Sequence, residues 1–365
     1  MQAKQNILHL PVYQPGKPIE DVKRELGLEE VIKLASNENP LGYSPLAKEA
    51  MLKELELLNI YPDGASVELT QVLANKLNVN SDQIIFGTGS SDIILMIARA
   101  FLVPGDETVM ADETFSQYKH NCEVENAKIV EVPLIDGVHD LDGMLAAITN
   151  KTKLLWICNP NNPTGTILTE NQLIPFLDRV PAHVLVVLDE AYCEYVSDEN
   201  FPDGVKLLDR YENVVVLRTF SKVYGLAANR IGYGVGPAAV VKLINQVREP
   251  FNTGRLAQVA AKASLLDDTF LTRSREQNQA GLDYYHAEFD RLGLDYFKGY
   301  GNFVMVDIKH PSMDIFQCLL RKGIIVRAGW KTYPTAIRVS VGTAEENKKF
   351  ILALEQVLAE LAVQN

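Results

Sequence analysis

Between residues 84 and 219, short apolar runs rich in β-branched residues alternate with segments whose apolar residues have helical spacing. The runs lie at 84–86, 107–110, 128–132, 153–158, 184–189 and 214–219. Their apolar residues fall on both faces rather than alternating, a pattern typical of strands buried on both faces of a parallel sheet. We therefore expect an α/β domain over residues 45–248, with a mostly parallel sheet covered by helices on both sides.

The rest of the chain follows a different pattern. A long helical pattern covers 256–292, and strand-like runs at 303–308, 323–327 and 336–342 alternate with further helices. These segments predict a smaller α+β domain over 249–365. Residues 1–44 are rich in proline, which disfavours regular strands and helices. They are predicted to form an arm that belongs to the small domain or to a dimer contact, outside the large sheet.

Composition excludes several classes of protein. The 365 residues are 47% hydrophobic and 22% charged, which is ordinary for a globular chain and not for a disordered or collagen-like one. With 35 Lys and Arg against 47 Asp and Glu, the net charge of −12 argues against nucleic acid or a membrane as partner. The four cysteines and six histidines lack metal-ligand spacing, and no secretory signal or apolar span is present. We expect a cytoplasmic protein without a metal.

Glycines and serines follow the first strand of the pattern. The segment FGTGSSD places Gly87 and Gly89 before Ser90 and Ser91, where a helix is predicted to begin. Backbone N–H groups at such a turn bind anions, so a phosphate site is one interpretation. The other is a serine or aspartate helix cap after a tight turn.

Polar residues also follow two later strands. The loop NPNNPTG (159–165) places the Asn162 amide at the end of one strand, where open α/β sheets bind ligands, although a plain turn has a similar composition. Asp189 ends the next strand, where a buried carboxylate needs a cation or hydrogen-bond donors. The alternative for Asp189 is a helix cap, and Tyr192 lies on its side if the chain turns helical.

A lysine follows the last of these strands. Lys222 is preceded by Thr219 and Ser221, and Arg230 comes shortly after it. Burial and neighbouring cations lower the pKa of a lysine and make its amine a nucleophile toward an aldehyde. A surface lysine extending from a strand end is the alternative. Because all these features follow successive strands, we expect them to gather at one edge of the sheet.

Together these segments resemble the fold type I pyridoxal-phosphate aminotransferases, and within them the histidinol-phosphate aminotransferase family. The similarity covers nearly the whole chain. It is carried by SNENPLG (36–42), IYPDG (60–64), FGTGSSDII (86–94), TFSQY (114–118), NPNNPTG (159–165), DEAY (189–192), TFSK (219–222), GLAANRIGYG (225–234), REPFN (248–252) and IRVSVGT (337–343). NPTG and SK mark the wider superfamily, whereas NENPLG, YPDG and REPFN narrow the resemblance to this family.

The resemblance implies a binding site for pyridoxal 5′-phosphate. Lys222 would form the internal aldimine, and Asp189 would pair with the pyridinium nitrogen. Asn162 and Tyr192 would hold the phenolate oxygen, and Phe115 would stack on the ring. Ser90, Ser91, Ser221 and Arg230 would lie near the phosphate, and Thr219 is a further implied cofactor-binding residue. Tyr61 would reach the phosphate from the other subunit of a homodimer. The implied substrate-binding residues are Tyr13, Asn37, Arg327 and Arg338.

The implied reaction is ping-pong transamination of L-histidinol phosphate with 2-oxoglutarate, which yields imidazole-acetol phosphate and L-glutamate in histidine biosynthesis. Two alternatives remain open, an aromatic amino-acid aminotransferase and a decarboxylase of O-phospho amino acids with the same fold. A cofactor-binding regulator and a nicotinamide dehydrogenase fit less well, because Lys222 is present and the third glycine of GxGxxG is missing. The sequence departs from the family at Asn229, usually leucine, and at Glu113, usually proline, which is expected to loosen the approach to Phe115.

Overall fold

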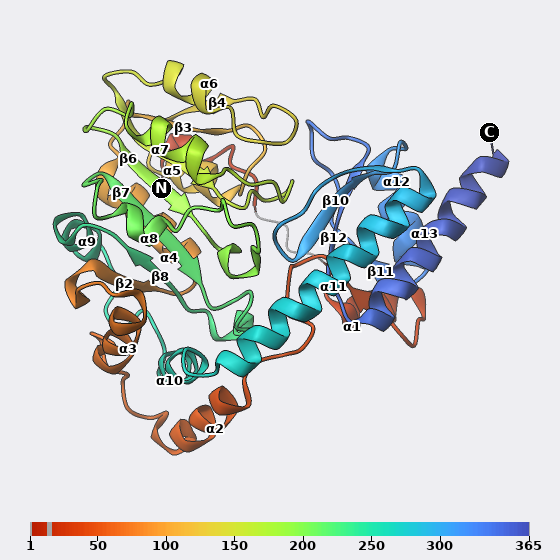
Figure 1. The fold of residues 1–365 in the computed structure, drawn as a ribbon, viewed down its shortest axis with the longest axis horizontal. Coiled ribbons are helices and arrows are strands. Elements are labelled where there is room, and N and C mark those ends of the chain that lie inside the picture. The colour runs from red at the N-terminus through yellow and green to blue at the C-terminus, as the bar shows by residue number, and fades with distance from the viewer. Residues whose placement is uncertain (1, 13–16, 365) are drawn as a thin grey trace.

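The computed structural model describes residues 2–12 and 17–364, which form a larger and a smaller body side by side (Figure 1). The larger body contains a seven-stranded sheet. In spatial order its strands are β2 (Ile84–Gly87), β8 (Gly232–Val235), β7 (Val214–Thr219), β6 (Leu185–Asp189), β5 (Thr152–Cys158), β3 (Glu107–Ala111) and β4 (Lys128–Val132). Six strands are parallel to one another, and β8 is antiparallel to its neighbours β2 and β7. The predicted mostly parallel α/β sheet is confirmed.

Helices cover both faces of this sheet, because alternate residues of each buried strand point to opposite sides. Val215 and Leu217 of β7 face one apolar cluster, whereas Val214 and Val216 face the other. The first cluster is covered by α4 (Ser90–Phe101), α5 (Gln117–Val124) and α9 (Ala238–Asn245). The second is covered by α2 (Pro45–Glu54), α3 (Val67–Leu77), α6 (Leu141–Ala146), α7 (Glu170–Leu177), α8 (Gly204–Leu207) and α10 (Arg255–Ser264).

The smaller body is built on an antiparallel sheet. Its strands, in spatial order, are β12 (Ala336–Ser340), β10 (Phe303–Asp307) and β9 (Asp295–Phe297). Its helices are α1 (Ile19–Leu26), α11 (Asp268–Leu292), α12 (Ser312–Arg321) and α13 (Ala344–Gln364). The described residues of the proline-rich arm lie outside the large sheet, and its β1 (Ile32–Lys33) forms a parallel pair with β11 (Ile324–Ile325).

Three features of the fold differ from the sequence pattern. The helical pattern over 256–292 is two helices, because the side chain of Asp267 accepts a hydrogen bond from the backbone N–H of Phe270 and starts α11 anew. Strand β8 was missed, since its glycine-rich sequence lacks a strand pattern. Short 3-10 helices also occur, namely η1 (Gln5–Ile7), η2 (Leu55–Leu57), η3 (Ser81–Gln83), η4 (Cys193–Tyr195) and η5 (Ala227–Asn229).

The predicted domain boundaries at residues 44 and 248 remain predictions. Helix α10, which follows the second boundary, packs against α2 and α3 and shares the apolar cluster under the large sheet. Among the described residues, no helix is long and apolar enough to cross a membrane.

Candidate active site

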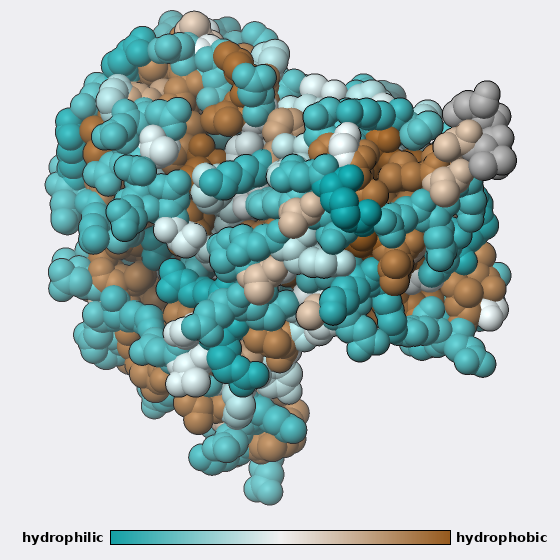
Figure 2. Space-filling model, turned by 45° about the vertical axis from the view of Figure 1, so that its right-hand side comes forward, coloured by the Kyte–Doolittle hydropathy of each residue, from teal (hydrophilic) through white to brown (hydrophobic). Residues whose placement is uncertain are grey.

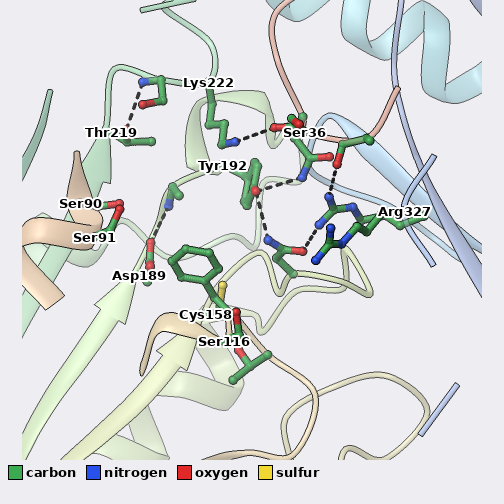
Figure 3. A pocket seen from close by; sticks show the side chains of 18 of the residues that line it. Ser36, Ser90, Ser91, Ser116, Cys158, Asp189, Tyr192, Thr219, Lys222 and Arg327 are labelled. Carbon is green, nitrogen blue, oxygen red and sulfur yellow. Dashed lines mark hydrogen bonds between the residues drawn. The ribbon is translucent and has the colours of Figure 1, made fainter. Parts of the chain in front are cut away.

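A cavity of about 520 Å³ lies at the carboxyl ends of β5, β6 and β7, beside the small body. Its walls come from both bodies (Figure 3). The sequence-predicted residues that line it are Asn37, Ser90, Ser91, Phe115, Asn162, Asp189, Tyr192, Thr219, Ser221, Lys222, Arg230, Arg327 and Arg338.

One end of the cavity is built to hold an anion. Ser90 and Ser91 form the first turn of α4, where unpaired backbone N–H groups and the helix dipole favour negative charge. Arg230 lies against this turn and donates from Nη2 to the Thr88 carbonyl at 3.2 Å and from Nη1 to Ser221 Oγ at 3.4 Å. Gly89 has a φ of +79°, and a Cβ there would lie 2.3 Å from Arg230 Nη2. Only glycine allows this close approach.

Asp189 is buried at the end of β6, 2% exposed. Its Oδ2 accepts a hydrogen bond of 2.7 Å from the Tyr118 hydroxyl, and its Oδ1 accepts one of 3.1 Å from the backbone N–H of Ala191. Burial raises the pKa of Asp189 to about 6, while these two donors act in the opposite direction. Sequence reasoning gave Tyr118 no role, although the TFSQY motif contains it.

Tyr192 joins a chain of polar contacts across the cavity (Figure 3). Its hydroxyl accepts from Asn37 Nδ2 at 3.0 Å and from Asn162 Nδ2 at 3.3 Å. Asn162 Oδ1 in turn accepts from Arg338, which also donates to the Ala35 carbonyl at 2.8 Å. Burial raises the pKa of Tyr192 to about 12, so the phenol is neutral at physiological pH. Asn162 and Tyr192 therefore contact each other, and their predicted role at the phenolate oxygen of the cofactor remains a prediction.

Lys222 follows β7 and points into the same cavity (Figure 3). Its Nζ donates to the Ser36 carbonyl at 3.2 Å and lies 5.5 Å from the centre of the Tyr192 ring. Burial, with Arg338 and Arg230 as nearby cations, lowers the pKa of Lys222 to about 8. A larger share of its amine is therefore neutral at pH 7 than for an exposed lysine.

Two arginines mark the end of the cavity nearest the small body. Arg327 and Arg338 form an antiparallel bridge through their backbones. The Arg338 guanidinium carbon lies 5.2 Å from the ring centre of Phe303 and 6.0 Å from that of Trp330. Cations over aromatic faces at these distances are stabilised electrostatically. Sequence reasoning missed Trp330, whose loop carries no regular pattern.

Phe115 and Thr219 complete the cavity wall. The Phe115 and Tyr118 rings pack edge to face, with ring centres 5.6 Å apart. Thr219 Oγ1 accepts a hydrogen bond of 3.1 Å from the backbone N–H of Ser221. The Asn229 amide contacts Met51 Sδ at 3.2 Å. The polar amide of Asn229, which stands where the family usually has leucine, therefore has a partner on α2.

Two predicted residues are not placed at the cavity. Tyr61 does not line it; it is 76% exposed and stacks on Phe251 with ring centres 4.7 Å apart. Tyr13 lies outside the described residues. Their proposed roles, at the partner's cofactor and at the substrate, remain predictions.

Comparisons with known proteins agree with this geometry. Residues 29–354 match the family model described as aminotransferase class I and II. The chain is 53% identical to a histidinol-phosphate aminotransferase of Brevibacillus brevis over 98% of its own length and 99% of the relative's. It is 50% identical to that of Bacillus subtilis strain 168, over 98% of this chain and 100% of the relative.

Among solved structures, histidinol-phosphate aminotransferase from Sinorhizobium meliloti in complex with pyridoxal-5′-phosphate superposes with a TM-score of 0.92 at 28% identity. The match covers 99% of this chain and 98% of that one. The arrangement of the large sheet and the small body is therefore the one found in that structure.

Proposed function

The chain belongs to the histidinol-phosphate aminotransferase family of class I and II aminotransferases, and from this membership we propose that it transfers the amino group of L-histidinol phosphate to 2-oxoglutarate. The products are imidazole-acetol phosphate and L-glutamate, and the cofactor is pyridoxal 5′-phosphate. The observation that carries the proposal is the placement of an anion-binding turn, a buried carboxylate and a lysine of lowered pKa around one cavity.

The donor set of the cavity fits this cofactor. Ser90, Ser91 and Arg230 suit its phosphate, because they present a helix N-terminus and a guanidinium at one end. Asp189 suits its ring nitrogen, and Lys222 suits its aldehyde. When bound, the cofactor supplies an aldehyde carbon and a ring that takes up the electron pair left by the substrate Cα proton.

Each residue around the cavity has a proposed role in binding or proton transfer. Asp189 would keep a proton on the ring nitrogen of the cofactor, because a buried carboxylate is stabilised by a cation beside it. Lys222 would accept the substrate Cα proton at Nζ when neutral and, once charged, would donate it to the former aldehyde carbon of the cofactor. Asn162 and Tyr192, whose side chains share a hydrogen bond, would hold the phenolate oxygen of the ring. Arg338, with Arg327 beside it, holds the anionic groups of histidinol phosphate and of 2-oxoglutarate.

A homodimer with shared active sites is part of the proposal. Exposed apolar side chains cluster on and after α2, and Figure 2 shows brown residues among teal ones at the lower end of the molecule, where Figure 1 places α2. They are Leu46, Leu52, Leu55, Leu57, Leu58 and Ile60, each at least 40% exposed and close in sequence to Tyr61. Such a surface on a monomer often marks an interface.

Mixing two inactive variants tests the shared site. Lys222→Ala removes the amine from one site, and Tyr61→Ala removes the proposed contribution to the other subunit's site. A mixed dimer has one site with both residues intact, so activity should reappear after the subunits are exchanged. Failure to recover activity, with exchange verified by mass, would remove Tyr61 from the site.

Steady-state kinetics with three amino donors tests the reaction. We expect parallel double-reciprocal lines with histidinol phosphate and 2-oxoglutarate, and a higher kcat/KM for histidinol phosphate than for phenylalanine or tyrosine. A preference for the aromatic amino acids would favour an aromatic amino-acid aminotransferase. Release of CO₂ from an O-phospho amino acid without a keto acid would favour a decarboxylase of the same fold. The cytoplasmic location also remains a prediction.

A further inference from the structure

Glu113 ties the large body to a loop of the small body at the rim of the cavity. Its carboxylate oxygen Oε1 accepts a hydrogen bond of 2.8 Å from Thr332 Oγ1 and one of 3.2 Å from the backbone N–H of Thr332. Both donors meet the same oxygen, so the side chain is directed to the loop. Glu113 and Thr332 are 219 residues apart in sequence.

The Glu113 backbone is itself fixed. Its carbonyl accepts a hydrogen bond of 3.1 Å from Asn161 Nδ2, and its N–H donates to Asp112 Oδ1 at 2.8 Å. Asn161 precedes Asn162 of the cavity, and Glu113 precedes Thr114 and Phe115. The sequence predicts that a glutamate in place of the family's proline loosens the approach to Phe115. These two hydrogen bonds instead hold the Glu113 backbone in place. The glutamate provides an anchored acceptor for the opposite loop.

The loop held by this contact carries part of the cavity wall. Residues 327–330 all line the cavity, and Thr332 follows them after one intervening residue, Lys331. Gly329 has a φ of +94°, a backbone conformation that side chains disfavour, so the chain turns sharply just before Trp330. The Trp330 ring lies 6.0 Å from the guanidinium carbon of Arg338. A displacement of this loop would therefore uncover Arg338.

We propose that Glu113 is a positioning residue for substrate binding: by holding Thr332, it keeps Trp330 against Arg338 at the substrate end of the cavity. This inference rests on the proposed function, in which Arg338 binds the anionic group of the substrate. The Trp330 ring excludes water from the guanidinium, and exclusion of water strengthens the attraction between that cation and an anion. Glu113 does not need to touch the substrate for this role.

Three variants separate the hydrogen bonds from the charge. Glu113→Ala removes the acceptor, Thr332→Val removes one of its two donors, and Glu113→Gln keeps an acceptor oxygen without the charge. Glu212→Ala is the matched control, because Glu212 is an exposed glutamate just before the amino end of β7, opposite the cavity.

Tryptophan quenching reports the loop without any turnover. The chain has two tryptophans, and Trp156 is fully buried, so acrylamide quenching of the full-length protein reports Trp330. We expect greater quenching in Glu113→Ala and Thr332→Val, and a value near that of the unaltered protein in Glu113→Gln and Glu212→Ala. A Trp330→Phe variant confirms the source of the signal.

Kinetics supplies the second readout. In Glu113→Ala we expect KM for histidinol phosphate to rise about three- to tenfold, the effect of losing a typical hydrogen bond, with kcat changed less than about twofold. Glu113→Gln should restore most of this loss. The proposal is wrong if quenching is unchanged in Glu113→Ala, or if KM rises without a change in quenching. If quenching responds but the unaltered protein does not transaminate histidinol phosphate, the proposed function fails and the contact stands.

Discussion

Replacing Tyr118 with phenylalanine removes one hydroxyl from the interior behind Asp189 and leaves the ring in place. Tyr118 is fully buried, and its ring stacks on Trp156 with ring centres 4.9 Å apart and planes 13° from parallel. Phenylalanine preserves that stacking. The variant loses the hydrogen bond of 2.7 Å that the Tyr118 hydroxyl donates to Asp189 Oδ2, together with the contact of the same hydroxyl with the Cys158 thiol.

The size of the effect follows from the charge on Asp189. A hydrogen bond to an ionised group contributes about 1.5–3 kcal/mol, and one pKa unit corresponds to about 1.36 kcal/mol. Without the Tyr118 hydroxyl, the pKa of Asp189 should rise from about 6 by about one to two further units. Only the carboxylate form of Asp189 attracts a protonated ring nitrogen. Protonation of Asp189 therefore competes with cofactor binding, and the competition begins at a higher pH in the variant.

The dissociation constant of pyridoxal 5′-phosphate, measured for both proteins between about pH 5 and pH 9, tests this reasoning. Well above both pKa values Asp189 is ionised in both proteins, and the two constants should agree. As pH falls, cofactor binding should weaken first in the variant. The ratio of the variant's dissociation constant to that of the unaltered protein should level off at about 10 to 100 once the pH is below both pKa values. Titration of Lys222 is common to both proteins and cancels in the ratio.

A matched control removes a similar hydrogen bond elsewhere. The Tyr296 hydroxyl donates to Asp290 Oδ1 at 3.1 Å on the small body, away from the cavity, so Tyr296→Phe should leave the ratio at one across the pH range. A ratio for Tyr118→Phe that is large but independent of pH would indicate altered packing. That result, or no loss at any pH, would refute the assigned role of Tyr118.

Three further predictions concern groups around the cavity. Acylation of Lys222 in the protein without cofactor should rise with pH and reach half its maximal rate near pH 8, because the amine reacts only when neutral, and a midpoint near 10 would contradict its burial. Gly225→Ala should destabilise the protein by about 2–4 kcal/mol in urea unfolding, because φ is +69° and a Cβ would lie 1.7 Å from the Gly42 carbonyl; an unchanged midpoint would count against this strain. Arg218→Ala should lower the free energy of unfolding by about 3–5 kcal/mol, because the carboxylate of Glu190, 1% exposed, would lose its ion pair of 2.8 Å, and a loss below about 1 kcal/mol would contradict that reasoning.

The sequence predicted best where a local pattern carries the information. Each of the six runs of the large sheet forms a strand within one or two residues of its predicted limits. In five of them burial on both faces leaves a mostly apolar sequence, whereas the edge strand β4 is largely exposed or half-buried. The positions of Asp189 and Lys222 follow from the same rule, since each comes at or just after the carboxyl end of a parallel strand. Those ends meet at one edge of the sheet in this class of fold.

The sequence predicted less where the information lies in contacts between distant segments. Tyr118 lies 71 residues from Asp189, and nothing in TFSQY distinguishes a hydroxyl that faces a carboxylate from one that faces solvent. Strand β8 was missed for a related reason. Its Gly232 leaves room for Ser90, whose backbone nitrogen would lie 2.4 Å from a Cβ at that position. The glycine that weakens the strand pattern is the one that the neighbouring turn requires.

Burial explains why one cavity can prepare two groups in opposite ways. It disfavours charge on both, so the pKa of Lys222 falls to about 8 while that of Asp189 rises to about 6. A neutral amine suits attack on an aldehyde, but a neutral carboxyl would fail to hold a cation. The site therefore needs hydrogen-bond donors that stabilise the carboxylate form of Asp189, whereas the Lys222 nitrogen needs its lone pair available for the aldehyde and for a proton. Tyr118 and the Ala191 N–H supply the first requirement, and the Ser36 carbonyl, which accepts from Lys222, leaves the amine able to take up a proton again.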